Sequence, residues 1–110
     1  MAAPPWMIVT ALLDPAIRAE FEDWHATVHL PRVLAIPGLV SGRSLINPSY
    51  AANYAMIYVF ESDEALRGAL ASPEAAEARR DWERWRDHMR DLTVHFYGEY
   101  VPARLYLRVN

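Results

Sequence analysis

Two histidines four residues apart, His25 and His29, lie beside Trp24 in a segment that runs into Pro31. Histidine can give or take a proton near neutral pH without a perturbed pKa, so a pair one helical turn apart suits acid and base catalysis. Because the dipole at a helix end favours a charged imidazole, we expect His29 to act as an acid or oxyanion partner, with His25 as auxiliary base. The structural alternative is a histidine that caps the last carbonyls of the helix and fills space.

The same spacing would let both imidazoles reach one metal ion. A metal site needs a third ligand, and the sequence offers only His95 or Glu61 as appealing partners. Ala26 also occupies the position that glutamate holds in the His-Glu-x-x-His motif of zinc proteases. We therefore predict that this segment holds no metal.

Aromatic residues form a second group of candidates. Trp82 and Trp85 recur at helical spacing in a later segment, and Tyr54 and Tyr58 alternate along an apolar strand segment. Such stripes are ordinary core packing, yet together with Trp24 these rings could wall a flat apolar pocket for a substrate. The arginines of the later helical segment are expected to form a solvated face.

Tyr58 and His95 are candidate polar groups that would orient a substrate. If His95 shares the helix-side face of the sheet with Tyr58, both converge with the first helix on one cavity. Alternation along the strand does not decide which face His95 and Tyr97 occupy. The equal alternative places His95 in a dimer interface.

The composition describes the scaffold that must position these residues. A chain of 110 residues with 53% hydrophobic content suits one domain over residues 1–110. The net charge of −3 gives no electrostatic reason to expect nucleic acid or an anionic membrane as a partner. The absence of cysteine excludes disulfides and thiolate chemistry and fits the cytoplasm. No apolar run approaches the roughly 20 residues of a membrane span.

Hydrophobic periodicity and breaker residues predict an alternating order of strands and helices. Strands are expected at 6–13, 39–46, 53–61 and 93–101, with a short tail strand at 104–109. The first helix should begin at the Asp14-Pro15 signal and end near His29, because Pro31 disfavours helical geometry just before it. Ser62 and Ser72 are predicted caps of a short helix at 63–71 and a longer one from 73 to about 88–90.

This β-α-β-β-α-β order predicts an α+β, ferredoxin-like antiparallel sheet with both helices on one face. The strands are apolar on both sides, whereas such a sheet normally has one solvated face. We therefore expect a homodimer in which two sheets pack face to face. The alternative is that the C-terminal segment folds back as the cover.

Two stretches of the chain resemble the dimeric α+β barrel superfamily, and within it the EthD-like and antibiotic-biosynthesis-monooxygenase-like small proteins. They are Trp24-x4-His29-Leu30-Pro31 and the proline-glycine turn followed by a serine-containing strand, Ile36 to Arg43. The resemblance implies a pocket between the helices and the sheet of each subunit, with His29 as the helix-end histidine. The chain departs from the pattern at Val28, where an acidic residue often stands, and at His25, where an aromatic one does.

Relatives of this kind include cofactor-independent oxygenases, lactone isomerases, polyketide cyclases and haem-degrading enzymes. The resemblance thus implies an enzyme that acts by proton transfer on an apolar, aromatic or polyketide-like molecule, without metal or nucleotide. Three alternatives stay open: a non-catalytic carrier of a hydrophobic ligand, a haem protein that uses His88 or His29, and a structural dimerisation module.

Overall fold

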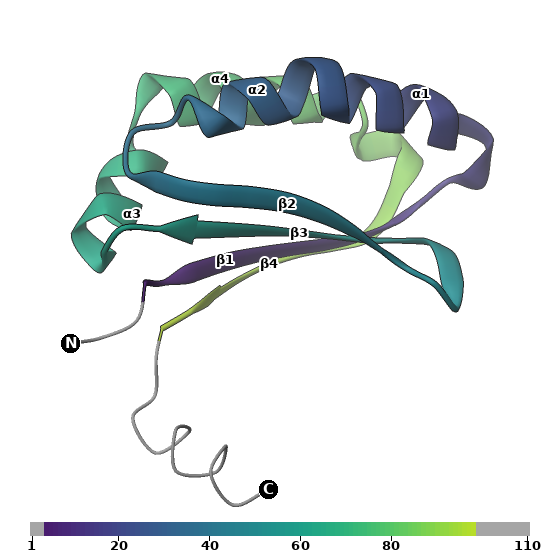
Figure 1. Cartoon of the computed structure of the whole chain (residues 1–110). Coiled ribbons are helices and arrows are strands. Elements are labelled where there is room, and N and C mark those ends of the chain that lie inside the picture. The colour runs from purple at the N-terminus through teal and green to yellow at the C-terminus, as the bar shows by residue number, and fades with distance from the viewer. Residues whose placement is uncertain (1–3, 99–110) are drawn as a thin grey trace, which may run out of the picture.

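The computed structural model describes residues 4–98 (Figure 1), so the expected tail strand at 104–109 lies outside the described residues. The strands are β1 (Trp6–Leu13), β2 (Leu39–Asn47), β3 (Tyr50–Phe60) and β4 (Met89–Tyr97). The α-helices are α1 (Arg18–Trp24), α2 (Leu30–Leu34), α3 (Asp63–Leu70) and α4 (Pro73–Glu83). Shorter helical turns cover Pro15–Ile17, His25–His29 and Arg86–His88.

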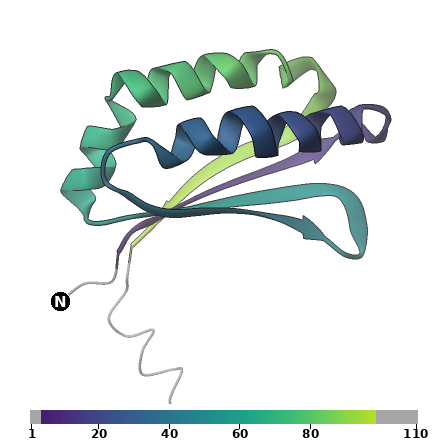
Figure 2. The same ribbon diagram turned by 45° about the horizontal axis from the view of Figure 1, so that its top comes forward.

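The four strands form one antiparallel sheet in the order β2-β3-β1-β4. Figures 1 and 2 show that all the helices cover the same face of this sheet and leave the other face bare. The predicted α+β, ferredoxin-like arrangement is confirmed. None of the helices within residues 4–98 is long and apolar enough to cross a membrane.

The helix starts follow the predicted capping residues. The side chain of Ser62 accepts a hydrogen bond from the Ala65 amide at 3.0 Å, and Ser72 accepts one from the Ala75 amide at 3.1 Å. The predicted end of α4 at about 88–90 is wrong, because the helix stops at Glu83. The strand β4 begins at Met89, four residues before the predicted start at 93. Pairing of Met89 with Leu13 of β1 extends the strand, a tertiary contact that local sequence does not encode.

The first helical segment was predicted to end near His29. This prediction is wrong, because the segment continues to Leu34. Residues His25–His29 form a π-helical turn, in which the Leu30 amide donates to the His25 carbonyl five residues earlier. Pro31 has no amide proton and its ring would collide with a carbonyl in a regular α-helix. A wider turn just before the proline absorbs this mismatch and lets the helix go on.

Both faces of the sheet are apolar, as predicted. The helix-covered face buries Val9 and Met56 with Tyr58 and Phe60, all at most 6% exposed. The bare face carries the alternate residues of the same strands, among them Ile8 and Ile57, which are directly opposite each other. Trp6, Leu45 and Tyr97 on this face are about half exposed. A second layer on this face therefore stays a prediction.

The turn before β2 depends on Gly38, which has a φ of +85°. A Cβ at this position would lie 2.9 Å from the Cβ of Ala65. Gly38→Ala should therefore destabilise the protein by about 2 kcal/mol or more, from the left-handed backbone and the collision. Gly68→Ala in α3, where nothing lies within 4 Å, should instead stabilise it by up to about 1 kcal/mol. Urea denaturation of both variants measures the difference, and equal stabilities would contradict the assignment.

Candidate functional site

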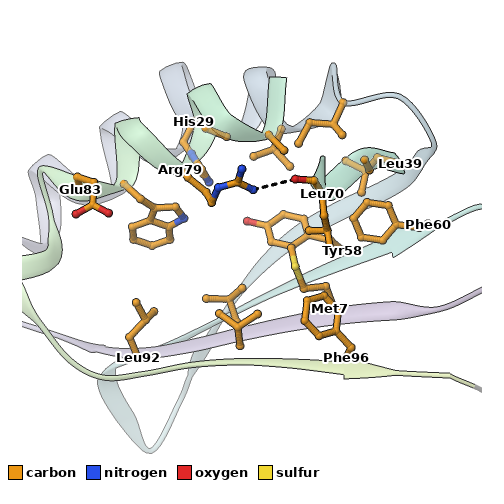
Figure 3. A pocket seen from close by; sticks show the side chains of 18 of the residues that line it. Met7, His29, Leu39, Tyr58, Phe60, Leu70, Arg79, Glu83, Leu92 and Phe96 are labelled. Carbon is orange, nitrogen blue, oxygen red and sulfur yellow. Dashed lines mark hydrogen bonds between the residues drawn. The ribbon is translucent and has the colours of Figure 1, made fainter. Parts of the chain in front are cut away.

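A cavity of about 360 Å³ lies between the helices and the sheet (Figure 3). Its walls are almost entirely apolar and come from the four strands of the sheet below and from the helical layer above. Its lining comprises Met7, Val9, His29, Val33, Ile36, Leu39, Tyr58, Phe60, Ala69, Leu70, Ala75, Ala78, Arg79, Trp82, Glu83, Arg86, Leu92, Val94 and Phe96. Because Leu92, Val94 and Phe96 are 38–51% exposed, the cavity opens to solvent between α4 and β4.

His29 is the candidate residue that the fold places most firmly at the cavity. It is 1% exposed and stacks on Trp24, with ring centroids 4.9 Å apart and planes tilted by 21°. The Trp82 ring packs against it edge-on at 5.3 Å. Its Nδ1 atom is buried and has no hydrogen-bond partner among the described residues. A polar atom left without a partner in such surroundings is costly unless a ligand contacts it.

The charge state of His29 differs from the sequence-based expectation. Burial lowers its pKa to about 4, with a further lowering by neighbouring His25, so the imidazole is neutral at pH 7. The predicted helix end that would have favoured a charged ring is absent, because the helix continues past Pro31 to Leu34. His29 can therefore accept a proton or donate a neutral N–H, whereas the expected acid role needs a ring that has first taken up a proton.

Tyr58 supplies the second polar group of the cavity. Its hydroxyl is buried and has no hydrogen-bond partner among the described residues, and burial raises the pKa of the phenol. The hydroxyl thus stays protonated and can donate a hydrogen bond. Gly42, directly opposite Tyr58 on β2, makes room for the ring, because a Cβ there would lie 3.1 Å from Cδ1. Sequence reasoning missed Gly42, which only the strand register identifies.

His25 is buried but does not line the cavity. Its ring lies 3.2 Å from the hydroxyl oxygen of Ser44 on β2 and 5.3 Å, between centroids, from the ring of His29. Burial lowers its pKa. The structure therefore places His25 where it joins the π-helical turn to the sheet, and a direct role as base on a molecule in the cavity is not compatible with this position.

Of the predicted aromatic walls, Trp82 and Tyr58 line the cavity, whereas Trp24, Trp85 and Tyr54 do not. Trp24 lies behind His29 and supports its ring. Trp85 is buried in the turn after α4 and packs edge-on against Phe21 at 5.5 Å. Tyr54 donates a hydrogen bond to Glu22 at 2.9 Å and borders a separate hollow of about 230 Å³. These three rings hold the helices on the sheet rather than forming walls of the cavity.

His95 lies on the bare face of the sheet, away from the cavity. It pairs with Ile8 of β1 and is exposed, and its ring centroid is 6.3 Å from that of Tyr97. Alternation along β4 directs Leu92, Val94 and Phe96 to the cavity instead. Of the two alternatives left open for His95, the convergence with Tyr58 on the cavity is therefore wrong, and the position of His95 suits the interface alternative. Within residues 4–98, no group of three metal-ligating side chains comes together.

Three charged residues at the mouth of the cavity were missed by sequence reasoning, which assigned the arginines of α4 to a solvated face. Arg79, Glu83 and Arg86 are exposed and yet line the cavity. Arg79 donates to the backbone carbonyl of Leu70 at 3.2 Å, and Arg86 pairs with Glu83 at 3.3 Å. Helical spacing contained a signal for Arg79, because it lies three residues before Trp82.

No protein-family model matches the sequence, and no curated protein matches it. Solved structures with the same fold do match. They include an ethyl tert-butyl ether D (EthD) family protein from Bacillus halodurans, 19% identical, with a TM-score of 0.69 over 91% of this chain and 100% of that one. A candidate antibiotic biosynthesis monooxygenase from Nitrosomonas europaea is 13% identical, with a TM-score of 0.70 over 93% and 95%.

A further candidate antibiotic biosynthesis monooxygenase, from Deinococcus radiodurans, is 12% identical, with a TM-score of 0.69 over 87% of this chain and 92% of that one. Sequence identities this low establish a similarity of fold only. These solved structures therefore confirm the fold that the resemblance implied, and the reaction must be argued from the site itself.

Buried and neutral, His29 should make stability depend on pH. The unfolded chain binds a proton at this residue below pH 6.5 while the folded protein resists it down to about pH 4. The free energy of unfolding should thus keep its full value above pH 6.5. As the pH drops from 6.5 to 4, protonation of His29 in the unfolded chain should lower it by about 3 kcal/mol. Urea denaturation at several pH values measures this loss. His29→Gln should reduce the loss, and an unchanged pH dependence in the variant would contradict the assignment.

Proposed function

We propose that the protein is an enzyme that moves a proton on a small apolar molecule bearing a carbonyl or enol oxygen. The observation that carries this proposal is that His29 and Tyr58 both line an apolar cavity. Each has a buried polar atom, His29 Nδ1 and the Tyr58 hydroxyl, without a hydrogen-bond partner among the described residues. A ligand oxygen there would relieve the cost of leaving them unpaired. The cavity volume lies within the usual range for small-molecule sites.

Each of the two residues has a separate task in this reaction. Neutral His29 takes a proton from the carbon next to the carbonyl, and the electrons of the broken C–H bond move to the carbonyl oxygen. The Tyr58 hydroxyl, which stays protonated, donates a hydrogen bond to that oxygen as negative charge develops. In a ligand with a C=C bond conjugated to the enolate, return of the proton from His29 to the far carbon of that bond completes an isomerisation. In a ligand with a second carbonyl, the enolate carbon attacks that carbonyl carbon, its C=O π bond breaks, and its oxygen takes the proton from His29, which completes a cyclisation.

The low pKa of His29 in this apolar cavity is compatible with this role. A developing enolate a few ångströms away would favour the charged imidazole, and in an apolar cavity this attraction is strong. The step begins with two neutral partners and ends with an ion pair, so the cavity never holds a net charge. Trp24 and the link between His25 and Ser44 keep the His29 ring in place.

The proposal is tested with 2-tetralone, a small apolar aromatic ketone whose C–H protons exchange with heavy water. Wild-type protein should accelerate deuterium uptake, followed by NMR. His29→Gln should reduce the acceleration by roughly 100-fold or more and Tyr58→Phe by at least about tenfold. His88→Gln, which changes an exposed histidine outside the cavity, is the matched control. Full activity in the His29 variant would sink the proposal.

A non-catalytic carrier of hydrophobic ligands is the second candidate. The observation that favours it is the pKa of about 4, which makes His29 a weak base in the unliganded cavity. A carrier would bind 2-tetralone with no acceleration of exchange, and binding would be insensitive to His29→Gln. Measuring binding and exchange on the same samples separates the two functions.

Haem fits the described residues poorly. His88 is exposed and does not line the cavity, so it could not ligate a haem bound there. His29 does line the cavity, but both aromatic neighbours at 4.9 and 5.3 Å crowd its ring. The cavity of about 360 Å³ is also narrow for a macrocycle of four pyrroles. The proposed reaction uses no haem.

We further propose that the protein is a homodimer formed through the bare face of the sheet. Apolar residues on this face, such as Trp6, Ile8 and Ile57, would lose their contact with water. The face also carries Arg43, whose long side chain can remain at its edge because β2 is an outer strand. The fold likeness supports the proposal, because the superfamily takes its name from such dimers.

Ile8→Glu should abolish this dimer, because it would bury a carboxylate among apolar residues with no partner of opposite charge. Light scattering after size-exclusion chromatography should change from dimer to monomer mass. Leu34→Glu on α2, where Leu34 is 51% exposed, is the control and should leave the dimer intact. A wild-type protein of monomer mass would contradict the proposal.

A further inference from the structure

The mouth of the cavity carries a second polar feature, formed by exposed charged residues. Of the two cationic residues in the lining, Arg86 is paired with Glu83, whereas Arg79 has no carboxylate within 4.0 Å among residues 4–98. Figure 3 shows the Arg79 side chain reaching from α4 to the Leu70 carbonyl, which accepts one of its hydrogen bonds. This contact holds the guanidinium at the cavity and leaves its other N–H groups available.

The charges at the mouth leave a local excess of one positive charge. The pair of Arg86 and Glu83 is neutral as a unit, so Arg79 supplies the uncompensated cation beside an apolar opening. Arg32, which does not line the cavity, is paired with both Asp81 and Glu77, so this separate group adds no free cation and has a net charge of −1. A planar guanidinium with several free donors is suited to a carboxylate.

The buried residues of the cavity determine which chemical group the inner end of the ligand can carry. The Tyr58 hydroxyl and His29 Nδ1 are buried and unpartnered, and both are uncharged at neutral pH, so the inner end of a ligand must be a neutral oxygen rather than an anion. Trp82 and the apolar side chains of β4 line the same cavity. We infer that the ligand is an amphipathic acid, with a neutral carbonyl or phenol at its inner end, an apolar aromatic body, and a carboxylate bound by Arg79.

This inference rests on the proposed function, because it assumes that the ligand oxygen meets Tyr58 and His29. It names Arg79 as a residue that determines specificity by holding the charged end, with no part in the proton transfer. Glu83 would repel the same carboxylate, so the ion pair between Glu83 and Arg86 must persist when the ligand binds.

The test uses two probes that differ only at the outer end, 6-acetyl-2-naphthoic acid and its methyl ester. Quenching of tryptophan fluorescence gives Kd for each. Arg79→Gln should raise the Kd of the acid about fivefold, the size expected of a partly exposed charge pair, and change that of the ester by less than about twofold. Arg79→Lys should restore part of the preference. In 0.5 M salt the wild-type advantage of the acid should shrink.

Arg80→Gln is the matched control, because Arg80 is the exposed neighbour on α4 that does not line the cavity. It should leave both Kd values unchanged. Equal effects of Arg79→Gln on acid and ester, or no effect on either, would overturn the inference. If Tyr58→Phe still weakened both probes in that case, the proposed function would stand. Failure of wild-type protein to bind either probe would overturn both.

Discussion

The site depends on one packing arrangement, the cluster of rings around Phe21. This residue is 2% exposed, and its ring centroid lies 5.5–5.9 Å from those of Trp24, Tyr54, Trp82 and Trp85. These contacts join the first helical segment, the second and the sheet in one apolar core. Because Trp24 belongs to the cluster and also stacks on His29, the packing that stabilises the fold also orients the candidate catalytic ring.

The same packing determines what the site can do electrostatically. Removing His29 from water costs the charged form most, so the imidazole is neutral, and removing Tyr58 from water keeps its proton in place. A site of two neutral hydrogen-bonding groups in an apolar cavity discriminates against buried anions. Charge is confined to the mouth, where Arg79 remains in contact with solvent. The separation of neutral interior and charged rim thus follows from burial alone.

Most of the fold could be predicted from alternation and capping residues, because these signals are local. The predictions from sequence were wrong where tertiary contacts determine the structure. Pro31 predicts a helix end, yet packing of Val33 in the core and a π-helical turn carry the helix to Leu34. The face of β4 that bears His95 depends on register with β1, which alternation leaves undetermined. Arg79 looked like a surface residue because nothing local indicates that β4 leaves the cavity open beside it.

The sequence by itself determined the order of the elements, the apolar character of both sheet faces and the choice of His29 and Tyr58 as candidate site residues. These properties depend on residue type and spacing, which the chain carries locally. Only the tertiary structure decided that His29 is neutral, that His25 supports rather than lines the cavity, and that His95 lies on the bare face. Each of those outcomes depends on which distant side chains exclude water from a group, and solvent exclusion is a property of the assembled fold.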